Sequence, residues 1–191
     1  MRIDRKLNLV VPVDGSAGRF YLHSMPISQV VFEQYFMSIS QAFSAIYGAG
    51  LNVVSGPRVA AMMLRRVAMR DGTWDGQEGV ENGLIREIRR LTNVAMPAPG
   101  GGWRMLPYQE LVDSKGIDDE DAATAENLIV FFILVSAMQL PAMRVNTLTA
   151  MGDLWVTSTT SSNITEFINS LPTSTPGGSS GAMTAGSSVP S

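Results

Sequence analysis

A chain of 191 residues with 45% hydrophobic residues is long enough to form one domain with a substantial core. Its 14 basic and 17 acidic residues give a net charge of −3, which provides no general attraction to nucleic acid or to anionic membranes. The absence of cysteine excludes disulfides, thiolate metal sites and thiol nucleophiles, and it fits a reducing compartment.

The first fifty residues predict a β-hairpin followed by a helix. Apolar residues alternate over residues 7–13, and the alternation resumes over 19–25 after a turn that contains two glycines. Ser28 is a candidate N-cap for a helix whose apolar residues recur at helical spacing over 32–47. Because two strands alone are marginal in water, either the helices or a second subunit must cover them, so a homo-oligomer is one alternative.

The centre of the chain predicts two amphipathic helices and a long loop. Pro57 suits the first turn of a helix that ends before Asp71, and a further helix spans 78–91. Residues 93–107 contain three prolines and three consecutive glycines, so we expect an irregular loop there, anchored by Trp103. A short helix is expected at 108–114.

Two longer helices are predicted next. The four acidic residues at 118–121 stand at a helix start, where they offset the partial positive charge, and that helix runs to about Met138. Pro141 ends or kinks it, and residues 142–156 continue as a helix. The longest apolar run, at 128–135, is far shorter than the ~20 residues that span a bilayer, so it predicts a buried helix and no membrane association.

The composition changes sharply after Val156. Ser, Thr, Gly and Pro make up 24 of the 35 residues at 157–191, and Glu166 is the only charged residue there. Such a segment buries too little apolar surface to offset the entropy of ordering it. We therefore predict an α+β, mostly helical domain at 1–156, in which the hairpin packs on a bundle of about four to five helices. A flexible tail at 157–191, disordered from residue 172 onward, is expected to follow.

No catalytic or metal-binding constellation is recognisable in the sequence. His23 is the only histidine, and no nucleophile motif accompanies it. The acidic run at 118–121 lacks the spacing of a calcium loop, and the glycines at 100–102 lack the lysine of a phosphate loop. The arginines at 65–70 and 86–90 predict a solvated, salt-bridged face. We expect a non-enzymatic protein without cofactor or metal; an enzyme that uses carboxylates alone is the alternative.

Two hydrophobic segments are candidates for partner binding. Phe131 and Phe132 lie in a helix that is apolar all round, which is either a central core helix or a face that binds an oligomer partner or client. A short amphipathic segment at 163–171 has the spacing of a helix that docks into a groove, either a partner's or that of its own domain. Its apolar residues are Ile164, Phe167, Ile168 and Leu171.

The order of these elements resembles that of the tail assembly chaperones of long-tailed bacteriophages. The resemblance extends over 1–156 and rests on the two N-terminal strands, the helix at 32–47, the segment 56–60, the sequence Glu-Ile-Arg-Arg-Leu at 87–91 and the Phe131-Phe132 helix. It implies a chaperone in the host cytoplasm that binds and solubilises the tape measure protein while tail tube subunits polymerise around it. A structural virion subunit, such as a tail or connector protein, is the alternative.

Overall fold

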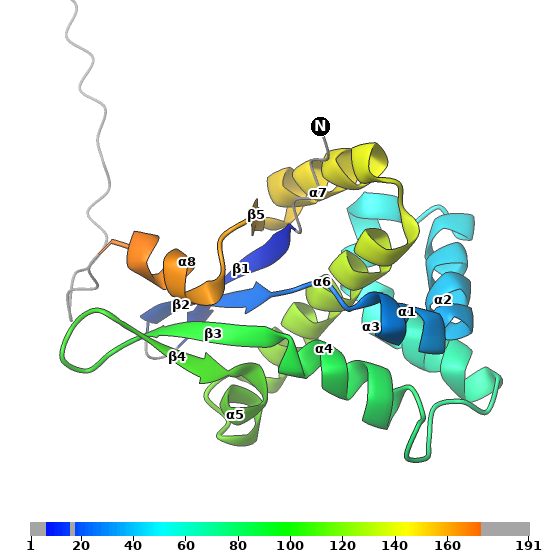
Figure 1. The fold of residues 1–191 in the computed structure, drawn as a ribbon, viewed down its shortest axis with the longest axis horizontal. Coiled ribbons are helices and arrows are strands. Elements are labelled where there is room, and N and C mark those ends of the chain that lie inside the picture. Colours follow the sequence, from blue (N-terminus) through cyan, green and yellow to red (C-terminus); the bar gives the residue numbers. More distant parts are fainter. Residues whose placement is uncertain (1–6, 16–17, 173–191) are drawn as a thin grey trace, which may run out of the picture.

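The computed structural model describes residues 7–15 and 18–172, in which helices lie on both faces of one antiparallel sheet (Figure 1). The predicted fold class, α+β and mostly helical with an N-terminal hairpin, is confirmed. Disorder was expected at 172–191; apart from Pro172, these residues lie outside the described part of the chain. The sheet has the order β4-β3-β2-β1-β5. Its strands are β1 (Asn8–Gly15), β2 (Gly18–Ser24), β3 (Thr92–Pro97), β4 (Trp103–Pro107) and β5 (Ser158–Thr160).

Within the described residues, eight α-helices and one π-helical turn complete the fold. The first four are α1 (Gln29–Gln34), α2 (Phe36–Gly48), α3 (Asn52–Arg70) and α4 (Arg86–Arg90), and the π-helical turn η1 (Glu81–Ile85) leads into α4. The others are α5 (Tyr108–Asp113), α6 (Asp119–Met138), α7 (Pro141–Trp155) and α8 (Ile164–Ser170). The predicted cap is present, since Ser28 accepts a hydrogen bond from the Val31 amide. The helix start expected at 118–121 is also found, and Asp118 caps it by accepting a hydrogen bond from the Asp121 amide.

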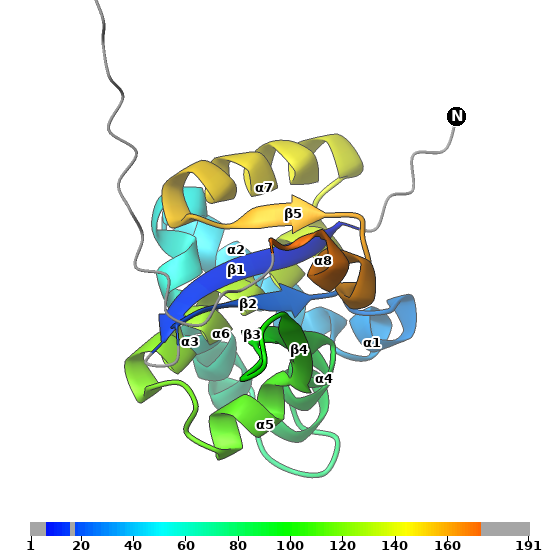
Figure 2. The ribbon, with the colours of Figure 1, turned by 90° about the vertical axis from the view of Figure 1, so that its left-hand side faces the viewer.

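The hairpin of β1 and β2 divides its side chains between two environments. Phe20 and Leu22 point to the same side as Leu9 and Val11, and all four belong to the main core. The alternate residues, such as His23, face the opposite side of the sheet, because successive side chains in a strand alternate. In Figure 2, α8 lies in front of the sheet and α6 behind it, so each face has its own helical cover.

The predicted loop at 93–107 is wrong, because most of it is a second hairpin. β3 pairs with β2 and with β4, and its residues Val94 and Met96 are buried in the core. Pro97 and Pro107 are the last residues of their strands, where a missing amide donor is tolerated. Gly101 and Gly102 adopt positive φ in the turn. The prolines and glycines therefore mark the ends of two strands.

The predicted domain boundary at 156 also differs from the structure. Residues 158–160 form β5, which pairs antiparallel with β1, and α8 follows at 164–170. Asn163 and Glu166 form a reciprocal capping box at the start of α8, with N···O distances of 2.9 and 3.1 Å. A segment of polar composition is thus ordered by strand pairing and capping, so the folded part extends to Pro172.

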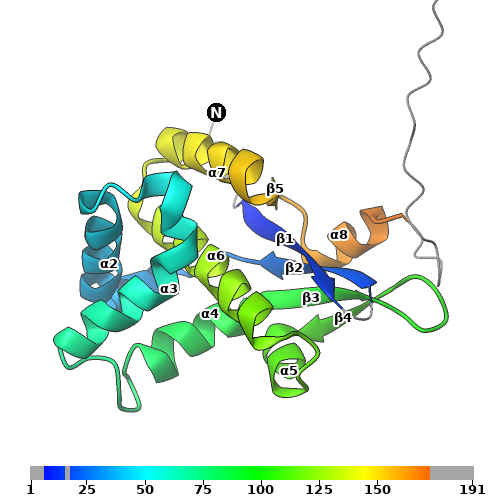
Figure 3. The same cartoon turned by 180° about the vertical axis from the view of Figure 1, so that it is seen from behind.

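Helix α6 is the centre of the helical layer. It contacts α2, α3, α4, α7 and strand β1, and Figure 3 shows it between α3 and the strands of the sheet. It is the one helix among the described residues that is long and apolar enough to span a membrane. Its residues from Leu128 to Val135 are nevertheless all buried by the surrounding elements of this domain.

Helix α3 begins five residues earlier than expected and contains Pro57 in its interior. A proline has no amide hydrogen, so the carbonyl of Val53, four residues before it, lacks its helical donor. The indole Nε1 of Trp155 donates to this carbonyl at 2.9 Å. One turn later, the Ala61 amide donates to Asn127 Oδ1 of α6 at 2.9 Å. Side chains from α7 and α6 therefore hold α3 at its proline.

The bond from Trp155 to Val53 yields a double-mutant prediction. Trp155→Phe removes the donor, and we expect a loss of about 1 kcal/mol in the free energy of unfolding, measured with urea. In a Pro57→Ala background the new backbone amide can donate to the same carbonyl, so Trp155→Phe should cost clearly less there. Equal costs in the two backgrounds would show that the carbonyl does not depend on the indole.

The burial of Phe132 yields a second prediction. Its side chain has no solvent exposure, and its helix is enclosed on several sides, so the site has little freedom to collapse. Phe132→Ala should therefore lower the free energy of unfolding by about 3–5 kcal/mol. An unchanged melting temperature together with a loss of self-association would instead place Phe132 at an interface.

Candidate protein-binding site

Helices α1 and α2 present a row of half-exposed aromatic rings, which we call the aromatic stripe. It consists of Phe32, Phe36, Phe43 and Tyr47. Ile39 and Ile46, which belong to the same helical pattern, are fully buried in the core. The helix at 32–47 was predicted as one element, but it breaks at Tyr35. The apolar residues of this region therefore lie on two faces, one that packs in the core and one at the surface.

Ring contacts hold the aromatic stripe in place. Phe32 and Phe36 meet edge to face with their centroids 5.6 Å apart, and Phe43 stacks on Tyr47 at 4.4 Å. Tyr47 in turn stacks at 6.5 Å on Phe131, which is buried. Such pairs contribute beyond the area they bury. The stripe is thus supported from the core, although Phe36 is 45% exposed.

Helix α2 carries no charged residue along its thirteen positions. A helix at the surface of a protein normally places charged or polar residues on its outer face. Here the outer face carries uncharged polar residues such as Ser44, and at its start the apolar Phe36 and Met37 are exposed, Met37 to 64%. Exposed apolar side chains beside a row of aromatic rings are typical of a site that binds another protein.

The corner between α6 and α7 continues this apolar surface. Gln139 Nε2 donates to the hydroxyl of Tyr47 at 3.0 Å, which ties the corner to the stripe. Leu140 and Met143 are exposed just beyond it, and Leu154 is exposed further along α7. Of the twelve large apolar residues that are exposed in the described chain, eight lie on α1, on α2 or at 140–156. The exposed apolar residues are therefore concentrated on these elements.

Polar atoms without partners are buried at the same corner. Ser136 Oγ, Gln139 Oε1 and Arg144 Nε have no hydrogen-bond partner within the described part of the chain. A depression of about 150 Å³, lined by Phe32, Ser136 and Arg144 among others, lies between α1 and this corner. Buried polar atoms in folded proteins are nearly always paired. The corner thus retains hydrogen-bonding capacity that its own chain does not use.

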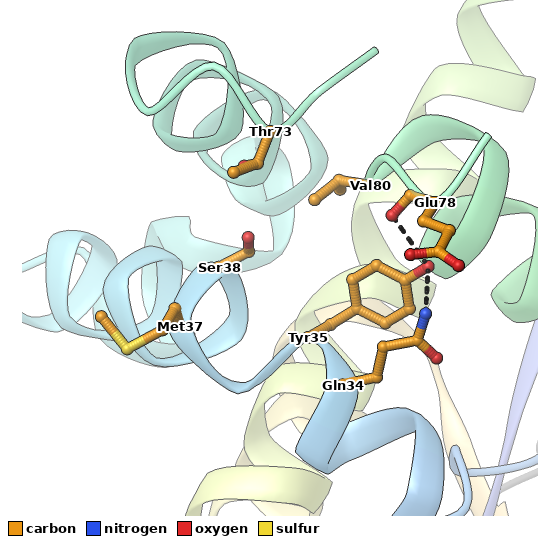
Figure 4. A pocket seen from close by; sticks show the side chains of 7 residues that line it. All are labelled: Gln34, Tyr35, Met37, Ser38, Thr73, Glu78 and Val80. Carbon is orange, nitrogen blue, oxygen red and sulfur yellow. Dashed lines mark hydrogen bonds between the residues drawn. The ribbon is translucent and has the colours of Figure 1, made fainter. Parts of the chain in front are cut away.

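A larger pocket lies on the other side of the break between α1 and α2 (Figure 4). The hydroxyl of Tyr35 donates to the Glu78 carbonyl and accepts from Gln34 Nε2, both at 3.3 Å. A side chain at Gly83 in the π-helical turn would overlap this hydroxyl, so the glycine makes room for it. The pocket holds about 230 Å³, less than the ~300 Å³ at which small-molecule sites begin. It suits one side chain of a partner.

Two predicted binding residues, Phe131 and Phe132, are not available to a partner. Both are at most 1% exposed and lie in the interior of the domain. Their helix is apolar all round because other elements surround it, so the core-helix alternative is correct. Phe131 contributes to the surface only indirectly, by supporting Tyr47.

The other predicted residues, on α8, are occupied by their own domain. Ile164, Phe167, Ile168 and Leu171 are half-buried. The Phe167 ring lies 5.7 Å from the rings of both Tyr21 and His23 on the sheet. The segment at 163–171 therefore docks in the way expected of an amphipathic helix, but the groove belongs to its own sheet.

Several charged residues of the described chain are engaged in ion pairs. Arg89 pairs with Glu126 and Arg90 pairs with Glu87, both at 2.7 Å, as the salt-bridged face predicts. Among residues 7–15 and 18–172, no group of three histidine or acidic side chains is placed to hold a metal ion. No family model, curated protein or solved structure matches this chain. The aromatic stripe and the corner at 139–143 are therefore the best candidate site.

The sequence contained a signal for this site that spacing alone did not separate from the core. Phe32, Phe36, Phe43 and Tyr47 share the helical period of the buried isoleucines, so the spacing does not show which of them face the core. The distinguishing feature is the absence of any charged residue from 35 to 48. A surface helix without charge indicates a face that a partner covers.

His23 yields a pH-dependent prediction. Burial lowers the pKa of its ring, so the folded protein holds the neutral form, whose Nε2 donates to the Ser162 carbonyl at 3.0 Å. The unfolded chain binds a proton below about pH 6.5. The stability is therefore complete above that pH and falls as the pH is lowered through the window beneath it, with a slope of up to ~1.4 kcal/mol per pH unit.

Unfolding free energies at pH 7.5 and pH 5.5 test this dependence. His23→Gln retains an amide donor but does not titrate, so it should lose less stability than the parent chain between the two values. The comparison cancels the contribution of carboxylates such as Asp14 and Glu87, whose pKa values are lowered by hydrogen bonds from arginines. Identical pH profiles for the two chains would contradict a buried neutral His23.

Proposed function

We propose that this chain is a non-enzymatic assembly chaperone that binds an apolar helical client, as a tail assembly chaperone binds the tape measure protein. The observation that carries the proposal is the aromatic stripe on a surface helix without charge. The resemblance in element order to phage tail assembly chaperones supports the same function. Tail tube subunits are the second partner that this proposal implies, and the host cytoplasm is the implied location.

The mechanism is reversible coverage of apolar surface. A client helix laid along the stripe would contact Phe36, Phe43 and the exposed Met37, with Leu140 and Met143 at the far end. Methionine side chains are flexible and polarisable, so they adapt to clients of varied sequence. The unpaired polar atoms at the corner would accept or donate to a polar group of the client. No chemical turnover is required.

The alternative, a structural virion subunit, relied on a hairpin that adds to a neighbouring sheet. Both strands of that hairpin are already paired on both sides, β1 with β2 and β5, and β2 with β1 and β3. β5 covers the outer edge of β1 only over Asn8–Val10, so just the remainder of that edge is left for a neighbouring sheet. The chaperone is therefore the function that the surface supports best.

Co-expression with the tape measure protein of the same genome tests the proposal. The parent chain should raise the soluble fraction of the tape measure protein, and Phe36→Gln with Met37→Gln should reduce that gain several-fold. Glutamine is a good helix former, so the exposed face of α2 changes without loss of helix propensity. The matched control is Met62→Gln with Met69→Gln, two exposed methionines on α3.

Two further measurements test the proposal: the salt resistance of the complex and the protein content of purified particles. An apolar contact should survive 0.5 M salt, whereas exposed ion pairs are screened over about 10 Å already at 0.1 M. An equal effect of the α2 and α3 variants would reject the stripe as the binding site. Finding the chain as a permanent component of purified particles, with no complex to a tape measure protein in lysates, would favour the structural subunit.

A further inference from the structure

The C-terminal part of the described chain lies across the sheet as one continuous piece, which we call the strap, residues 157–172. It comprises β5 and the capped helix α8 (Figures 1 and 2). On the face that α8 contacts, Val10, His23 and Ala95 are at most 3% exposed. The ring of Phe167 meets those of His23 and Tyr21, with Trp103 packed on Tyr21. This face is the one that α6 does not cover.

A small number of contacts hold the strap. β5 pairs with β1 over three residues. The Ser162 carbonyl accepts from Asn8 Nδ2 at 2.9 Å and from His23 Nε2 at 3.0 Å. Trp103 Nε1 donates to the Pro172 carbonyl at 2.8 Å. No residue of α8 is fully buried. Defined hydrogen bonds thus fix the position of the strap, but the strap buries little apolar surface.

The connection between α7 and the strap is strained. Val156 has φ of 52° and ψ of 36°, in the left-handed region. A β-branched residue in that region is a genuine outlier, because its side chain crowds the backbone. The next residue adds a second cost, because Thr157 Oγ1 is buried without a partner in the described residues. The closed position therefore carries costs that an opened strap would not.

We propose that the strap opens about Val156 and that the strap of a second copy of this chain takes its place, giving an exchanged dimer. The face is built for one known occupant, the sequence of the strap itself, and every copy carries it. The strap contacts are the same in both forms and cancel in the comparison. Two terms of the free energy of dimerisation remain. An extended arm relieves the strain at the hinge, which favours the dimer, and the entropy lost on association opposes it. Phe167 of one chain then completes the aromatic cluster of the other.

The absence of cysteine allows a clean cross-linking test. Val10 and Ser158 are paired positions on β1 and β5, at a spacing that a disulfide can bridge. In a chain with Val10→Cys and Ser158→Cys, the closed monomer oxidises within one chain, whereas an exchanged dimer oxidises between chains. We expect the covalent dimer on a non-reducing gel to increase with the protein concentration at which oxidation takes place.

Two further arms separate exchange from chance contact. Val156→Gly removes the strain, because glycine adopts positive φ freely. Since each exchanged dimer relieves two hinges, the substitution should lower the association constant of the dimer by about thirtyfold or more. Mixing a Val10→Cys chain with a longer, tagged Ser158→Cys chain should give the mixed covalent dimer. Only intrachain disulfides at every concentration would overturn the proposal. So would dimerisation of the Ser158→Cys chain alone to the same extent as the mixture, or an unchanged constant in the Val156→Gly chain.

Discussion

Helix α6 needs apolar contacts on every side, and the rest of the fold is arranged to provide them. A helix without a polar face gains its stability only when it is buried all round. The sheet covers one side through β1, while α2, α3, α4 and α7 cover the others. The close crossing of α3 and α6 depends on Gly56, since a side chain there would overlap the ring of Phe131. The elements around α6 can therefore bind a partner only through the faces that do not contact α6.

The surface of α1 and α2 is one such region. Ile39, Ala42 and Ile46 satisfy the core, and the aromatic rings beside them are left at the boundary with solvent. The rings are held by one another and by Phe131, so they form a rigid platform and keep little of the freedom of exposed side chains. A preformed apolar platform binds with less entropic cost than a flexible one. The helices thus combine structural and binding roles on adjacent faces.

Much of the fold was predictable because its signals are local. The first hairpin, the caps at Ser28 and Asp118 and the long apolar helix each follow from spacing within a few residues. The second hairpin was missed because Pro97, Pro107 and three glycines suggest irregular backbone, whereas pairing of β3 with β2 decides the outcome. Pro57 was placed at a helix start because the donor that replaces its amide, Trp155, lies about a hundred residues away. Tertiary contacts of this kind override local preference.

The candidate site was predictable only in part. The amphipathic segment at 163–171 was recognised, but its groove is formed by Tyr21, His23 and Trp103, which are far away in sequence. Composition placed the boundary of the folded part before β5, because three strand residues and a capping box weigh little in an average over many residues. Function by apolar contact leaves no motif, so spacing identifies the apolar residues but not which of them reach the surface.

The pairing of β1 with β5 has a consequence for how the chain acquires its structure. Asn8 meets Ser162 across 154 positions, so the outer edge of the first strand stays unpaired until almost all of the described chain has been synthesised. Contacts of such sequence separation slow folding, because the entropy of closing the intervening loop is lost before the contact is gained. During translation the nascent protein therefore exposes an open sheet edge, which is a template for strand addition by other chains. Residues Asn8–Val10 of that edge are paired only after β5 has left the ribosome.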